Sequence, residues 1–216
     1  MVVIGMTGGI GCGKSYVSDK LKLRGIPVYD SDTRAKLLTA TDRSIKDALT
    51  GLVGPDLFCQ CGCGVMRKEV LSAFIFGHPD NMARVNAIIH PRVREDFRRW
   101  ADGLDGKDMC VLESAILFES GFDAEVDYSV CVDAPVALRI RRCVKRDGTT
   151  EQAVIARINS QMDQTEKCRL ADSVIVNDDV RPLEPQIDEL INNVRKLLNK
   201  KNNNYAKRDS DNFRQA

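Results

Sequence analysis

Residues 8–15 read GGIGCGKS and follow the short apolar run VVIGMT of residues 2–7. They satisfy the pattern G-x-x-x-x-G-K-[ST], whose glycines let backbone N–H groups face phosphate oxygens while the lysine and the serine serve the phosphates and Mg²⁺. An apolar run stopped by glycines is typical of a strand buried on both faces. The dinucleotide-binding pattern G-x-G-x-x-G fails at its last position when it is read from Gly9 or from Gly11. The stretch therefore predicts a strand, a loop and a helix around the polyphosphate of a nucleoside triphosphate.

The residues after the loop predict a helix. Residues 14–23 place Val17, Leu21 and Leu23 near one side, with charged residues elsewhere. Gly25 stands at the position where glycine commonly stops a helix. We therefore expect this helix to bury one side and to end just before Gly25.

Strands and helices then alternate along most of the chain. Residues 26–30 read as a second strand, and a new helix is expected from Ser31, because Ser31 and Asp32 are good N-terminal residues. The stretch of about 40–100 is periodic in the helical sense and reads as a mostly helical insertion. Three further strands are expected, at residues 109–113, 128–133 and 173–177. The alternation predicts an α/β fold of the P-loop NTPase type, with a parallel sheet flanked by helices.

Composition limits the kind of partner. Lys and Arg number 32 against 31 Asp and Glu, so the net charge is +1, whereas nucleic-acid binders normally carry a basic surplus. No run approaches the ~18 apolar residues of a membrane span, and the N-terminus lacks the features of a signal peptide. Eight cysteines scattered over a chain of this length read as reduced thiols. We expect a cytoplasmic protein that acts on a small molecule, with neither nucleic acid nor membrane as partner.

Two acids follow the second predicted strand. Asp30 ends it and Asp32 lies two residues on, beside the carboxyl edge of the sheet, where α/β folds bind ligands. A carboxylate there can accept the proton of an attacking hydroxyl group. The alternative is that Asp32 only caps a helix, and the spacing alone does not choose between these roles.

Three arginines share one predicted helical face. Arg139, Arg142 and Arg146 are spaced by three and four residues, which aligns them along one side of a helix. Such a face could close over phosphate groups and neutralise charge at the transferring group. The alternative is a solvated basic surface balanced by nearby acids.

Together these blocks resemble the dephospho-coenzyme A kinases, in order along the chain from residue 2 to about 195. TGGIGCGKS looks like the family's P-loop, DSDTRAK like its D-A-D-x-x-A-R segment, IIHPRVR like H-P-x-[IV]-R, and ESAILFESG like D-x-P-L-L-F-E. RCVKRD and SQMDQTEKCRLADSVIVN look like the lid and the final strand. The resemblance implies a helical acceptor-binding domain and a lid beside the P-loop core. It divides the chain into a core of about 1–34, 106–136 and 168–200, an acceptor domain of about 35–105, a lid of about 137–167 and a mobile tail, 201–216.

The resemblance also implies roles for single residues. Lys14 would act on the β and γ phosphates of ATP, and Ser15 would hold Mg²⁺ through ATP. Asp32 would be the base on the 3′-hydroxyl of dephospho-coenzyme A, and Arg142 would contact the transferring phosphate. His90 and Glu113 are assigned to the acceptor side, with Glu113 also where an Mg²⁺ shell is usually completed. The ATP site would be lined by Thr7, Gly8, Gly9, Ile10, Gly11, Cys12, Gly13, Lys14, Ser15, Tyr16, Arg146 and Asn177.

Four positions depart from the family's pattern. They are Ser31, Lys36, Ala115 and Lys167, the second and the last standing where arginine is usual or frequent. Lysine cannot repeat the bidentate geometry of arginine, so the detailed contacts at these two positions are open.

The alternating cysteines of CQCGCG, Cys59, Cys61 and Cys63, differ from the usual paired spacing of zinc ligands. Two histidines, His78 and His90, lie downstream, but the segment aligns with a loop in which the family usually has no ligands. We expect no bound metal there.

The sequence thus predicts phosphorylation of dephospho-coenzyme A by ATP and Mg²⁺, in a monomer or a small homo-oligomer. A nucleoside or nucleotide kinase of the same fold is the enzymatic alternative. A nucleotide-sensing switch is the non-enzymatic one, although the guanine-selecting N/T-K-x-D signature is absent from SVIVNDD and VCVDAP.

Overall fold

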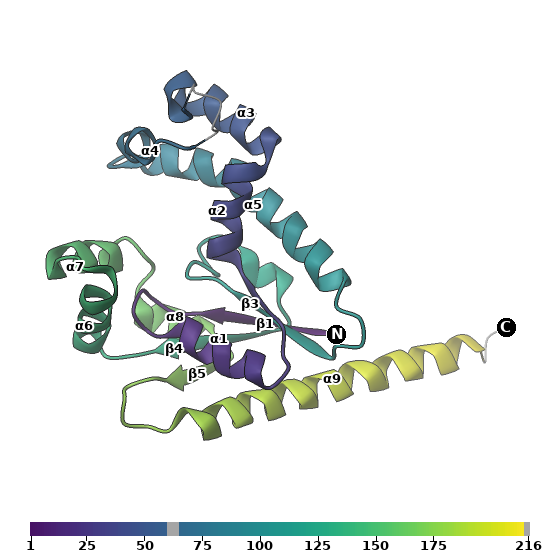
Figure 1. Ribbon diagram of the computed structural model, residues 1–216. Coiled ribbons are helices and arrows are strands. Elements are labelled where there is room, and N and C mark those ends of the chain that lie inside the picture. Colours follow the sequence, from purple (N-terminus) through teal and green to yellow (C-terminus); the bar gives the residue numbers. More distant parts are fainter. Residues whose placement is uncertain (60–64, 214–216) are drawn as a thin grey trace. The chain divides into compact units, whose positions relative to one another are not determined.

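The computed structural model describes residues 1–59 and 65–213, with residues 204–213 described by their backbone alone. The chain divides into two compact units, Met1–Tyr29 with Asp105–Ala216, and Asp30–Leu104 (Figure 1). The elements in chain order are β1 (Val2–Thr7), α1 (Lys14–Leu23), β2 (Val28–Asp30), α2 (Ser31–Thr41), α3 (Arg43–Val53), η1 (Pro55–Leu57), α4 (Lys68–Ile75), α5 (Pro79–Asp102), β3 (Met109–Glu113), η2 (Phe122–Glu125), β4 (Tyr128–Asp133), α6 (Val136–Asp147), α7 (Glu151–Asn159), α8 (Gln164–Leu170), β5 (Ser173–Val176) and α9 (Leu183–Phe213).

The first unit is built on a five-stranded sheet in the order β2-β3-β1-β4-β5. The central strand β1 runs parallel to both neighbours, with Ile4 opposite Val111 of β3 and Tyr128 of β4, and β4 runs parallel to β5. Parallel neighbours need crossover connections, which explains the helices between the strands. The predicted parallel α/β sheet is confirmed.

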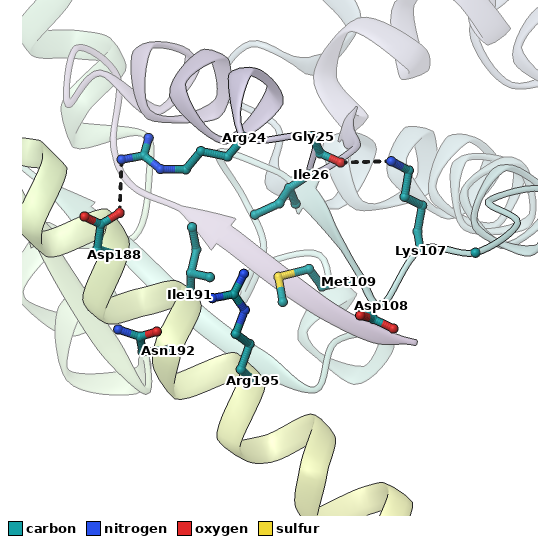
Figure 2. Close-up of a pocket in the computed structure, with 11 residues that line it drawn as sticks. Arg24, Gly25, Ile26, Lys107, Asp108, Met109, Asp188, Ile191, Asn192 and Arg195 are labelled. Carbon is teal, nitrogen blue, oxygen red and sulfur yellow. Dashed lines mark hydrogen bonds and ion pairs between the residues drawn. The ribbon is translucent and has the colours of Figure 1, made fainter.

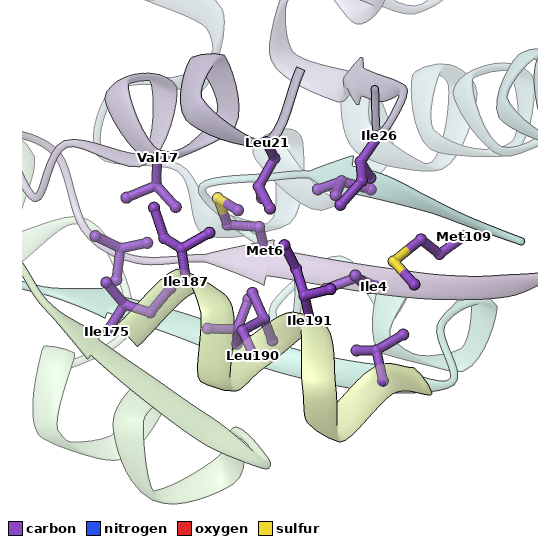
Figure 3. Packing of buried hydrophobic residues seen from close by; sticks show 14 of the residues in the cluster. Ile4, Met6, Val17, Leu21, Ile26, Met109, Ile175, Ile187, Leu190 and Ile191 are labelled. Atoms are coloured by element: carbon purple, nitrogen blue, oxygen red, sulfur yellow. The ribbon is translucent and has the colours of Figure 1, made fainter. Parts of the chain in front are cut away.

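One face of this sheet carries the main core. Alternate residues of β1, Ile4 and Met6, point to that face and are fully buried. Figure 3 shows side chains of α1 and α9 converging on them, among them Leu21 and Ile187. The prediction for α1 was wrong at Leu23, which is 88% exposed. Leu23 lies about 200° around a helix from Leu21, since successive residues turn by ~100°.

Both ends of α1 are fixed by glycine. Gly13 has a φ of 91° and lies at the N-cap, a left-handed conformation that favours glycine. At the other end Gly25 has a φ of 77°, and its N–H donates to the carbonyl of Lys22 while that of Ile26 donates to Leu21. These two bonds form a Schellman motif, so the predicted helix stop at Gly25 is confirmed.

The second unit is helical, as the sequence predicts for this insertion. Asp30 caps α2 by accepting the N–H of Thr33 at 3.0 Å and its hydroxyl at 2.6 Å. The expectation of a new helix from Ser31 is confirmed, since Ser31 is the first helical residue and Asp30 is its cap. A core that includes Ile45 of α3 and Val85 of α5 holds the unit together.

The polar end of the chain continues α9, whose helical backbone extends to Phe213. Its burial stops earlier: Ile187, Leu190, Ile191 and Val194 pack on the sheet, and polar residues follow Leu198. The mobility of residues 201–216 stays a prediction. Among the described helices, none is both long and apolar enough to cross a membrane.

Candidate functional site

The loop of residues 8–15 connects the carboxyl end of β1 to α1, as predicted. In the described part of the chain, the backbone N–H groups of Gly11, Gly13, Lys14 and Ser15 donate to no protein acceptor. They lie where the positive end of the α1 dipole adds to their own partial charges. Unused donors at the start of a ten-residue helix form a site for an anion.

The first half of the loop is bonded differently. The N–H of Gly9 donates to Oε1 of Gln164 at 2.8 Å, and that of Ile10 donates to Oε1 of Gln161 at 3.0 Å. Both glutamines were quoted in the resemblance but were not selected as site residues. The loop therefore has a first half held by protein side chains and a second half with free donors.

Three cations lie against the loop. Nζ of Lys14 donates to the carbonyl of Gly8 at 2.9 Å. Nε of Arg139 donates to the carbonyl of Ile10 at 3.0 Å, and this side chain is nearly fully buried. Arg142 donates to the carbonyl of Gly11 at 3.4 Å and is paired with Asp179. The arginine face is thus directed at the loop through Arg139 and Arg142, and Arg139 is a contact that the sequence prediction left out of the site.

A buried carboxylate stands beside the start of α1. Glu113 ends β3 and accepts the hydroxyl of Ser18 at 2.6 Å and that of Ser15 at 3.3 Å. Glu113 and Ser15, both predicted as site residues, are therefore brought together. Hydroxyl and carboxylate oxygens are hard ligands of the kind that Mg²⁺ prefers, so the two residues fit that ion.

Asn177, also predicted, holds the loop from the end of β5. Its Nδ2 donates to the carbonyl of Cys12 at 2.8 Å, and a Cβ on Gly13 would come within 2.1 Å of that nitrogen. Cys12 has a fully buried side chain, and burial raises the pKa of its thiol. The side chain of Cys12 is therefore enclosed in the protein, and its backbone N–H and carbonyl bond Gly9 and Asn177.

The remaining predicted loop residues differ in exposure. Thr7 ends β1 fully buried, and its hydroxyl has no hydrogen-bond partner among the described residues. Tyr16 is exposed, with Nζ of Lys20 4.9 Å from its ring centroid. Arg146 forms an ion pair with the adjacent Asp147 rather than with the loop. Its role at a nucleotide stays a prediction.

Lys167, one of the departures from the family's pattern, is fully buried. Its Nζ forms an ion pair with Glu119 at 2.8 Å and donates to the carbonyl of Ala115 at 2.5 Å. These contacts account for a buried ammonium, which needs both a counter-charge and a hydrogen-bond acceptor. In this structure the lysine fixes the segment after β3, which includes another of the four departures, Ala115.

Within the helical unit, Asp32 is the second residue of α2, and its side chain is exposed. Asp30 occupies the cap, so the alternative role proposed for Asp32 belongs to its neighbour. His90 lies within α5, directly before Pro91, and burial, followed by the charge of Arg94, lowers its pKa. Lys36 is exposed. The catalytic and substrate-binding roles of Asp32 and His90 stay predictions.

The cysteine segment lies mostly outside the described residues, including Cys61 and Cys63. The flanking backbone closes on itself, since the N–H of Cys59 donates to the carbonyl of Val65 at 2.9 Å. Among the described residues, no group of three or more His, Cys, Asp or Glu side chains is placed to hold a metal. The expectation of no metal in CQCGCG remains to be tested.

A cavity of about 580 Å³ lies at the amino ends of β1 and β3 (Figure 2). It lies between the turn at Gly25, the residues before Met109 and one side of α9. Figure 2 shows the guanidinium group of Arg195 directed into it, and Nζ of Lys107 donates to the carbonyl of Gly25 at 3.2 Å. Arg24, on its rim, is paired with Asp188 at 3.1 Å. This end of the sheet is basic too, but no described helix begins among the residues that line the cavity.

A parallel sheet whose central strand runs into such a loop and helix defines a P-loop protein of the α/β class. The chain belongs to the dephospho-CoA kinase family: the family's model, described as Dephospho-CoA kinase, matches residues 2–182. A relative named Dephospho-CoA kinase from Bacteroides fragilis is 47% identical over 190 residues, covering 88% of this chain and 91% of the relative. One of the same name from Porphyromonas gingivalis is 43% identical over 196 residues, covering 90% and 95%.

Solved structures agree on the fold. The Thermus thermophilus protein TT1252 matches with a TM-score of 0.77 and 28% identity, covering 91% of this chain and 97% of that one. Dephospho-CoA kinase from Campylobacter jejuni matches with a TM-score of 0.59 and 21% identity, covering 92% and 98%. The resemblance drawn from the sequence motifs is confirmed at the level of the family.

Proposed function

We propose that this chain transfers the γ-phosphoryl group of ATP to the 3′-hydroxyl of dephospho-coenzyme A, giving coenzyme A and ADP. The observation that carries the proposal is the set of four unused N–H groups at Gly11, Gly13, Lys14 and Ser15. Membership of the dephospho-CoA kinase family supplies the acceptor.

The four N–H groups would bind the β and γ phosphates, and Lys14 would exchange the carbonyl of Gly8 for a phosphate oxygen. That carbonyl accepts a hydrogen bond from the ammonium group at 2.9 Å. Ser15 and Glu113 would hold Mg²⁺, which neutralises charge on the β and γ oxygens when it is bound.

In the transfer step, the 3′-oxygen forms a bond to the γ-phosphorus while the bond from that phosphorus to the oxygen of ADP breaks. Asp32 is the proposed acceptor of the hydroxyl proton, since it is exposed in the first turn of α2 and Asp30 supplies the cap of that helix. Arg142 is the proposed ligand of the transferring group and would have to leave Asp179 to reach it.

The test is a coupled ADP-release assay in which ATP and Mg²⁺ are offered with dephospho-coenzyme A, adenosine or AMP in separate reactions. We expect release of ADP with dephospho-coenzyme A at a rate at least tenfold above that with the other two. Preference for AMP or adenosine would instead identify a nucleotide or nucleoside kinase. Hydrolysis of ATP that is indifferent to all three acceptors would favour a switch.

A further inference from the structure

Gln164 is the first residue of α8, and its side-chain amide is bonded at both ends. Its Oε1 accepts the N–H of Gly9 at 2.8 Å, and its Nε2 donates to the carbonyl of Val132, in β4, at 3.1 Å. The two bonds fix which way round the amide lies, because the oxygen can only accept and the nitrogen can only donate. Gln164 therefore joins the glycine loop to the strand next to β1.

The start of α8 is itself fixed. Asp163 caps the helix by accepting the N–H groups of Thr165 at 2.8 Å and Glu166 at 3.2 Å. A capped first turn leaves Gln164 little freedom of backbone conformation. The glutamine thus reaches the loop from a rigid base.

The loop is held equally closely on its other side. A Cβ on Gly9 would lie 2.1 Å from Nη2 of Arg139 and 3.1 Å from Oε1 of Gln164. Arg139 in turn bonds the carbonyl of Ile10, and Gln161 accepts its N–H. Side chains of residues 139–164 therefore bond the backbone N–H groups of Gly9 and Ile10 and also the carbonyl of Ile10.

We propose that Gln164 is a positioning residue for phosphoryl transfer. By holding the peptide of Gly9, it keeps the loop in the curvature that directs the N–H groups of Gly11, Gly13, Lys14 and Ser15 at one anion. Gln161 has the same role with a single bond to Ile10. The inference rests on the proposed function, because it assumes that the anion is the polyphosphate of ATP.

The expected change in kinetic constants depends on the stage of the reaction at which the loop binds phosphate. The loop N–H groups bind phosphate before and during transfer alike, so a looser loop weakens nucleotide binding in both states. Loss of preorganisation then raises KM for ATP and Kd for Mg·ADP, whereas kcat changes little. A residue that contributed only to folding would lower the melting temperature and leave both constants unchanged.

The experiment compares Gln164→Met, which keeps length and loses both hydrogen bonds, with Gln161→Met and a matched control. The control is Asn81→Leu, which removes a bond of 2.9 Å from a side-chain amide to a backbone carbonyl, that of Phe74, within the helical unit. Calorimetric titration with Mg·ADP, thermal melting and steady-state kinetics are measured for each. We expect Kd for Mg·ADP to rise about tenfold in Gln164→Met, about threefold in Gln161→Met and less than twofold in Asn81→Leu.

A Kd within twofold of the parent in a folded Gln164→Met variant overturns the positioning role. If that variant does not fold, Gln161→Met decides, with a Kd within twofold counting against the proposal. The proposed function fails separately if the parent binds Mg·ADP but releases no ADP when it is offered ATP together with dephospho-coenzyme A. A parent that does not bind Mg·ADP overturns both.

Discussion

The two ends of the central sheet carry basic side chains, yet they offer different chemistry. At the carboxyl end, Lys14, Arg139 and Arg142 lie around a helix N-terminus with four free N–H donors. At the amino end, Lys107 and Arg195 line a cavity (Figure 2), and no described helix begins among its lining residues. Cations on long side chains are common at any surface, whereas aligned backbone donors need a loop of a particular shape. The backbone, more than the charge, distinguishes the candidate phosphate site.

The largest effect should come from removing the ammonium group at the carboxyl end. Lys14→Ala should lower kcat/KM for ATP by about 10²–10³-fold, the range expected when a preorganised charge on a phosphate is lost. Its free energy of unfolding should change by about 1 kcal/mol or less, because only the bond to the carbonyl of Gly8 is lost. Coupled kinetics and thermal melting check both. Turnover within threefold of the parent would remove the P-loop interpretation.

Asp32 is the next test, because its exposed carboxylate is the proposed base. Asp32→Asn should bind ATP and dephospho-coenzyme A as the parent does and lower kcat at least tenfold, towards the ~10²-fold typical of a lost general base. Its free energy of unfolding should change by about 1 kcal/mol or less, since the cap of α2 is Asp30.

Asp30→Ala is the matched variant two residues away. It should cost about 1 kcal/mol of stability through the lost cap, and it should reduce kcat less than Asp32→Asn does. Full turnover in Asp32→Asn would transfer the role of base to another residue.

The arginines at the carboxyl end should separate into two kinds. Arg142→Ala should reduce kcat about tenfold while Kd for ATP changes less than threefold, since lid charge matters most as charge moves to the transferring group. Arg146→Ala, whose parent side chain is paired with Asp147, should have the smaller effect. Steady-state kinetics and nucleotide titration check both variants. Equally small losses of kcat in Arg142→Ala and Arg146→Ala would favour the solvated basic surface.

The smallest effect is expected at the amino end. Arg195 has no hydrogen-bond or ion-pair partner within residues 1–59 and 65–203, so Arg195→Ala removes charge without breaking a bond. KM for ATP and kcat should stay within twofold of the parent at low ionic strength, where a long-range charge effect is largest. A tenfold rise in KM for ATP would mean that the charge of Arg195 at the amino end affects nucleotide binding at the carboxyl end.

Much of this site follows from short-range sequence signals. The strand, the loop and the stop of α1 depend on neighbours within a few residues, so the glycine pattern and Gly25 suffice to predict them. Leu23 was predicted wrongly, because its distance around the helix from Leu21 counts for more than its hydrophobicity. The start of α2 at Ser31 was predicted correctly, but capping was considered for Asp32 and not for Asp30, since Asp30, Ser31 and Asp32 are all good caps.

The contacts that hold the loop could not be found in the same way. Arg139 lies 129 residues from Ile10, and Gln164 lies 155 residues from Gly9. No local propensity encodes such pairs. The sequence offered only a weaker signal for these contacts. Two glutamines lie three residues apart in a block already matched to the family, and the second begins a helix that Asp163 caps.

The buried thiol of Cys12 has a practical consequence for covalent chemistry. A cysteine inside a nucleotide loop invites electrophilic ATP analogues that would alkylate it and so block the enzyme. Such a reagent needs an accessible thiolate, but this sulfur is fully enclosed and its pKa is raised by burial. An electrophile carried on the phosphates would therefore not reach this sulfur, and a thiol-directed reagent is a poor basis for inhibitors of this chain.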